Sequence, residues 1–166
     1  MAAPTAAMVT TPIAVWQHQM GMSTPVLQGL GGAGTITAGM PLIMSSGLLV
    51  PAAGSNADDT ELVGLSMSNS TVTGTRINYV PFWPGIVFVG QLLSVGSETG
   101  VTTPGDAHRF ESYGLGVSGT GSRYFFDVDN TTDNLFCIID ILDVATAKGR
   151  VLATPNNYGR TVWGAA

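Results

Sequence analysis

Short apolar runs separated by turn residues follow one another along most of the chain from Val26 onward. Runs of this length, with no sustained periodicity of about 3.6 residues, are typical of a β-sandwich or a β-barrel. The pattern predicts a mostly β fold, a compact antiparallel β-sandwich or barrel-like domain. The expected elements are a hairpin over 40–51, strands over 61–67, 75–80, 123–128 and 135–144, and a short helical turn leading into a strand over 108–117.

The centre of this pattern, from Ile77 to Ser97, contains no charged residue. Its length alone would suit a membrane-spanning helix. However, Pro81 and Pro84 would each remove a helical hydrogen bond, and the residues around them are mostly β-branched or aromatic, which favours strands. We therefore expect two strands joined by a corner at 81–85, with Phe88 of the second strand in the core, and no membrane anchor.

The N-terminal part of the chain lacks this pattern. Residues 1–24 have no acidic or basic side chain apart from His18 and contain scattered prolines, which predicts an extended arm. Exposing Ile13, Val15 and Trp16 to water is unfavourable, so we expect these side chains to contact a neighbouring subunit or a partner. The alternative is a disordered tail or a strand within the chain's own domain.

Three segments make up the expected domain organisation. They are the arm over 1–24, a β-domain over 25–146 and an irregular C-terminal extension over 147–166. The glycine-rich stretch 29–34 is interpreted as a flexible joint after the arm. Trp163 in the extension is expected to dock the end of the chain and is the fourth candidate partner-binding residue.

Composition adds a constraint on the surface. Charged residues make up only 10% of the 166 residues, while 45% are hydrophobic. Soluble domains usually carry about 25% charged residues, so much of this exterior is expected to be covered by copies of the chain or by a partner. The net charge of −5 and the scattered lysines and arginines argue against nucleic-acid binding. The first residues also lack the pattern of a signal peptide.

Catalytic and metal-binding candidates are few. Neither His18 nor His108 belongs to a recognisable nucleophile motif, so no enzymatic activity and no cofactor are expected. Cys137 is the single cysteine and is expected to be a buried small hydrophobe. The oxygen-rich turn with Asp127, Asp129 and Asp133 departs from the EF-hand pattern, so no metal site is assigned there, and cation binding by these three stays open.

The order of the predicted pieces carries a resemblance over about residues 34–144. The pieces are the hairpin entry Thr35–Leu42 with Ser46–Val50 after it, the strand Leu62–Ser66, the segment Trp83–Phe88, and downstream Tyr113–Leu115, Gly119–Arg123 and Phe126–Val128. In this order they resemble the capsid decoration, or cement, proteins of tailed bacteriophages.

This resemblance implies an enzymatically inert structural protein of the virion. Such a protein binds the exterior of the assembled capsid and stabilises the shell, with the major capsid protein as its partner. It implies a homo-oligomer, with a trimer favoured, and no nucleic-acid or membrane partner.

Two other functions stay open from the sequence. One is another virion structural component, in the tail or a fibre. The other is a carbohydrate-binding β-sandwich, in which aromatic rings would stack on the faces of sugars. The candidate rings for that function are Trp83, Tyr113, Tyr124 and Trp163.

Overall fold

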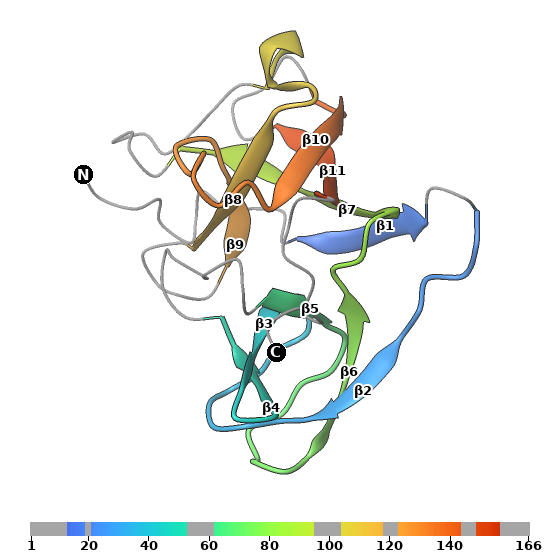
Figure 1. Cartoon of the computed structure of the whole chain (residues 1–166), viewed down its shortest axis with the longest axis vertical. Helices are drawn as coiled ribbons and strands as arrows, with labels where there is room; N and C mark the ends of the chain where they lie inside the picture. The colour runs from blue at the N-terminus through green and yellow to red at the C-terminus, as the bar shows by residue number, and fades with distance from the viewer. Residues whose placement is uncertain are drawn as a thin grey trace.

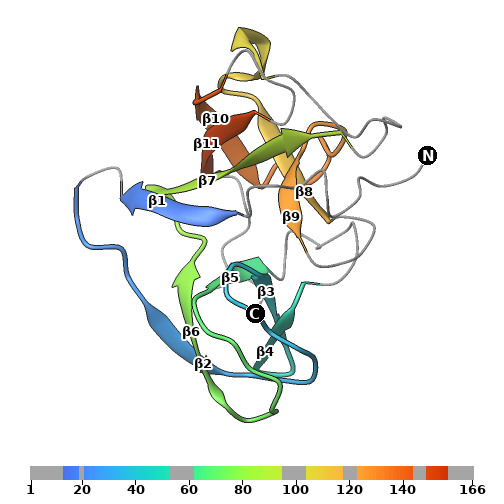
Figure 2. The same cartoon turned by 180° about the vertical axis from the view of Figure 1, so that it is seen from behind.

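The described part of the protein is all-β, as the sequence predicts, with one short 3-10 helix among its strands (Figure 1). The structure, a computed structural model, describes residues 13–18, 21–52, 62–94, 104–117, 123–143 and 149–156. A barrel forms one end of the molecule and an antiparallel sheet the other, and the view from behind shows the same division (Figure 2). The expected β-sandwich or barrel-like class is therefore confirmed.

The barrel is built from the second half of the chain. Its strands are β7 (Ile86–Leu93), β8 (Ser112–Val117), β9 (Tyr124–Asp127), β10 (Phe136–Ile141) and β11 (Arg150–Pro155). They follow the order β7-β11-β10-β8-β9, and a parallel pairing between Leu92 of β7 and Phe126 of β9 closes the ring. The 3-10 helix η1 (Asp106–His108) precedes β8, so a helical turn does lead into this strand, but it ends at the residue where the predicted segment 108–117 begins.

The sheet at the other end is built from the first half of the chain. Its strands are β2 (Leu27–Leu30), β3 (Pro41–Ser45), β4 (Leu48–Pro51), β5 (Leu62–Ser66) and β6 (Arg76–Pro81), in the order β2-β6-β5-β3-β4. The predicted hairpin is β3 and β4, joined by a turn at Ser46 and Gly47. Both turn residues have positive φ, which matches the right-handed twist of the strands.

The glycine-rich stretch is a packed part of this sheet, so its interpretation as a flexible joint is wrong. Gly29 lies in β2, and Gly31 forms a parallel bridge with Leu49 of β4. A Cβ atom on Gly29 would lie 2.7 Å from the Leu49 side chain. The absent side chains therefore let β2 approach β4 and curl the sheet.

The predicted corner at 81–85 joins the two halves of the molecule. Strand β6 ends at Pro81 and β7 begins at Ile86, as expected. The two strands do not pair with each other, because the chain passes here from the sheet to the barrel. Gly85 has a φ of +89°, a conformation in which a Cβ would be strained.

The main core lies in the barrel and continues to the face of the sheet beside it. Phe88 is 0% exposed, which confirms its predicted burial. Its ring meets those of Phe82 and Phe136 edge to face, with centroids 5.1 Å and 6.1 Å away. Leu65 and Val80 from the sheet belong to the same cluster, so one apolar core holds both ends together.

Part of the expected arm belongs to the domain itself. Residues Ala14–His18 form strand β1, which pairs antiparallel with β7. Ile13 is 1% exposed within the main core, and Val15 packs against that core. Gly90 leaves room for Ile13, because a Cβ there would lie 3.1 Å from Cγ1 of Ile13. The proposed division at residues 24 and 25 therefore separates a strand from its own sheet, and residues 1–12 lie outside the described part.

The expected C-terminal extension also contributes to the barrel. Strand β11 lies between β7 and β10, so residues 150–155 are central to the ring and not irregular. Val151 and Ala153 point into the main core. The boundary at residue 147 is thus wrong for this strand, and Trp163 lies outside the described residues.

Candidate interaction surface

A polar cluster lies at the end of the barrel that carries η1. Arg109 forms ion pairs with Asp106, at 3.0 Å, and with Asp140. Its hydrogen bonds to these two carboxylates raise the pKa of the Arg109 guanidinium. Nδ1 of His108 lies 3.0 Å from the hydroxyl oxygen of Tyr113, the next partly buried pair in this cluster. The cluster fixes the loop after η1 against strands β8 and β10.

Cys137 differs from its prediction as a buried residue. It is partly exposed on the outer face of β10, because its neighbours Phe136 and Ile138 point into the barrel. Burial still raises the pKa of its thiol, despite a hydrogen bond with Ser112 that acts in the opposite direction. Raising this pKa reduces the share of reactive thiolate near neutral pH.

The carboxylates of the oxygen-rich turn after β9 accept hydrogen bonds from within the turn and from Ser94. Oδ1 of Asp127 accepts a hydrogen bond from the backbone N–H of Asp129 at 3.0 Å. Oδ2 of Asp133 accepts one from the Asn130 side chain at 2.6 Å, and Oδ2 of Asp129 accepts one from Ser94 at 2.6 Å. Within the described ranges, no three acidic, histidine or cysteine side chains gather as ligands for a metal ion.

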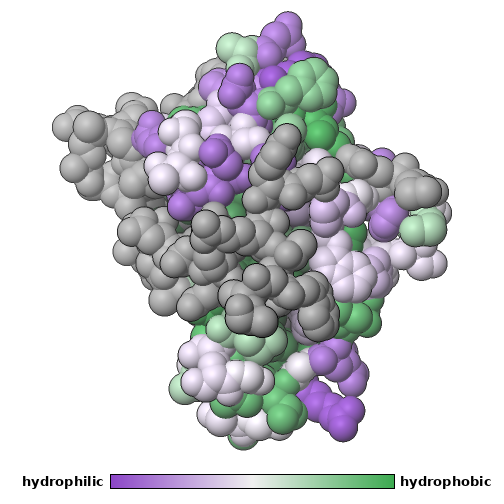
Figure 3. All heavy atoms as spheres, viewed as in Figure 1, coloured by the Kyte–Doolittle hydropathy of each residue, from purple (hydrophilic) through white to green (hydrophobic). Residues whose placement is uncertain are grey.

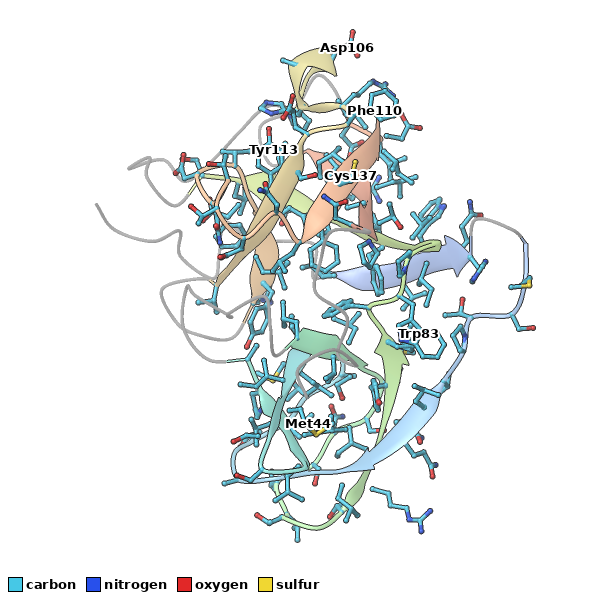
Figure 4. The ribbon with its side chains drawn as sticks, in the orientation of Figure 1. Met44, Trp83, Asp106, Phe110, Tyr113 and Cys137 are labelled. Carbon is cyan, nitrogen blue, oxygen red and sulfur yellow. The ribbon has the colours of Figure 1, made fainter. Side chains whose placement is uncertain are left out.

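Large apolar side chains remain exposed on several elements outside the core. In the described residues they are Trp16, Met22, Val26, Leu30, Met44, Met67, Val72, Trp83 and Phe110. Figure 4 places Trp83 at the corner where β6 leaves the sheet and Phe110 at the η1 end of the barrel. The space-filling view shows apolar surface over the sheet and at the η1 end, where hydrophilic residues border it (Figure 3).

The four candidate partner-binding residues have different positions. Trp16 is 49% exposed on β1, an edge strand, and is therefore available to a partner. Ile13 lies in the chain's own core and the half-buried Val15 packs against it, as the alternative of a strand within the domain predicts for these two residues. Trp163 lies outside the described residues.

Phe110 is an exposed aromatic that the sequence reading missed. Its side chain is 76% exposed, more than any of the other large apolar side chains named above. The available signal was a single aromatic between charged neighbours, in the sequence Asp106 to Glu111. A single apolar residue within a polar loop has no apolar neighbours in sequence with which to enter a core. This pattern favours a surface position for its side chain.

Two of the rings considered for sugar stacking are not accessible. Tyr113 and Tyr124 are both buried, and the Tyr124 hydroxyl donates a hydrogen bond to the backbone oxygen of Ala52. Their role in sugar stacking is therefore wrong, whereas Trp83 is 41% exposed.

Comparison with known proteins adds no family assignment. No protein-family model matches the chain, and no curated protein sequence matches it significantly. A search of the described residues for a helix long and apolar enough to cross a membrane finds none.

Proposed function

We propose that this protein is a non-enzymatic structural component of a phage virion, which decorates the exterior of the capsid and stabilises the shell. In this proposal it acts as a homo-oligomer, with a trimer favoured, and its other partner is the major capsid protein. The observation that carries the proposal is the set of large apolar side chains that stay outside a well-filled core, above all Phe110, Trp16 and Trp83.

Composition supports the same function. A chain with 10% charged residues and exposed aromatic rings has a surface suited to lasting contact with other proteins. Segments between residues 34 and 144 resemble phage decoration proteins, and this resemblance indicates the outside of an assembled shell as the partner surface. One apolar cluster joins the barrel to the sheet, as expected of a subunit that binds as a single unit.

The test uses purified protein and empty shells of the phage that encodes it. Co-sedimentation should show saturable binding, and decorated shells should break at a higher temperature than bare ones. Light scattering of the free protein should report an oligomer. A panel of glycans should leave tryptophan fluorescence unchanged. Protein that fails to bind or stabilise shells would overturn the proposal, and recovery with purified tails instead would favour a tail component.

A further inference from the structure

Phe110 combines two unfavourable features. Its ring is 76% exposed to water, and its backbone has a φ of +63°. For a bulky side chain this left-handed conformation is a rare and strained one, which glycine or asparagine adopts far more readily. Neither feature helps the chain to fold, because an exposed ring adds little to the core. Such strain is typical of positions kept for function.

The surrounding loop holds Phe110 firmly in this conformation. The backbone N–H of Phe110 donates to the oxygen of Ile138 at 2.7 Å, and the N–H of Ile138 donates to the oxygen of Glu111 at 2.9 Å. On the other side, Arg109 is fixed by Asp106 and by a carboxylate of β10. The ring is therefore presented by a rigid support, which lowers the entropy lost when a partner covers it.

Three carboxylates belong to the segments that hold Phe110, namely η1, the residue after Phe110 and strand β10. Asp106 has a side chain that is 90% exposed, Glu111 is exposed, and Asp140 is half exposed. The guanidinium of Arg109 is already shared between Asp106 and Asp140. In an interface, these negatively charged side chains are complementary to lysine or arginine side chains of a partner.

We propose that Phe110 is a docking residue. Its ring inserts into an apolar pocket with a basic rim on the outer surface of the capsid shell, which is formed by a different protein. The inference rests on the proposed function and names the contact that performs it. A second copy of this chain is a poor occupant at this loop, because a two-fold contact there would place the same carboxylates against each other.

The experiment compares wild type with Phe110→Asn and Phe110→Gly, which suit a positive φ but lack the ring. Val72→Asn is the matched control, because Val72 is an exposed apolar residue in the β5–β6 connection. Each variant is tested by thermal unfolding, by light scattering and by co-sedimentation with empty shells at low and high salt.

Both Phe110 variants should unfold at the same or a higher temperature than wild type, while their affinity for shells falls about tenfold or more. Val72→Asn should bind as wild type, and Glu111→Gln should weaken binding and its dependence on salt. Equal shell binding by wild type and Phe110→Asn would overturn this inference and leave the proposed function standing. A failure of wild type to bind overturns both. Loss of the oligomer with Phe110→Asn would show that a second copy occupies the ring.

Discussion

The replacement Phe88→Ala tests the core most severely. The side chain is 0% exposed, and its ring lies in an edge-to-face cluster with Phe82 and Phe136. A buried Phe→Ala change typically costs about 3 to 5 kcal/mol, since transfer free energy is lost and a cavity remains. Because strands from both ends of the molecule meet at this core, we expect little relaxation and a value near the upper limit. Such a loss is a large part of the roughly 5 to 15 kcal/mol that stabilises a typical domain.

The matched control for this measurement is Phe110→Ala, the same chemical change at an exposed position. We expect its effect on the free energy of unfolding to stay within about 0.5 kcal/mol, as is usual at the surface. Urea unfolding followed by circular dichroism compares the two variants at equal protein concentration. A loss below about 1 kcal/mol for Phe88→Ala, or equal losses for the two variants, would refute the described core.

Three further predictions concern the rest of the fold. Gly64→Ala should prevent or severely weaken folding, because a Cβ there would lie 2.3 Å from a backbone oxygen of β6, whereas Gly105→Ala has nothing within 4 Å and should be tolerated in thermal unfolding. Ile13→Ala should lower the free energy of unfolding by about 2 to 5 kcal/mol in urea titrations, since the residue is a buried part of the core; an unchanged midpoint would show that β1 does not belong to the domain. Hydrogen bonds from the backbone N–H of Ile141 and from Arg109 lower the pKa of Asp140 below its usual value of 3.8. The ionised carboxylate therefore stabilises the folded state above that pH, and this stabilisation is lost as the pH falls through the lowered pKa. Unfolding measured from pH 5 to pH 2 should show this acid loss, and Asp140→Asn should reduce it; identical pH profiles would contradict the assignment.

Much of the fold was predictable because patterns of neighbouring residues indicate its elements. The corner at 81–85 and the burial of Phe88 follow from proline positions and from an uncharged run, which require no knowledge of distant partners. The β3–β4 hairpin likewise depends on a Ser-Gly turn between apolar residues. These features are local, so the sequence beside them is enough to indicate them.

Strand β11, which the sequence did not predict, and strand β1, which it offered only as an alternative to an arm, depend on partners far along the chain. Strand β11 lies in a segment without a clear apolar pattern before the break at residues 154–159, and its place in the ring comes from pairing with β7 and β10. Strand β1 is recognisable only once Gly90 of β7 is seen to leave space for Ile13. For Phe110, the deciding facts are a positive φ and two anchoring hydrogen bonds, and neither follows from the type of residue.

The central claim is that this protein sits on the outside of a capsid shell and attaches through the η1 end of its barrel. A density map of the intact phage particle tests that claim directly. We expect the domain on the exterior, with residues 106–111 against the shell and the Phe110 ring covered by the major capsid protein. A map with no copy on the exterior, or with the η1 end facing solvent, would contradict the account.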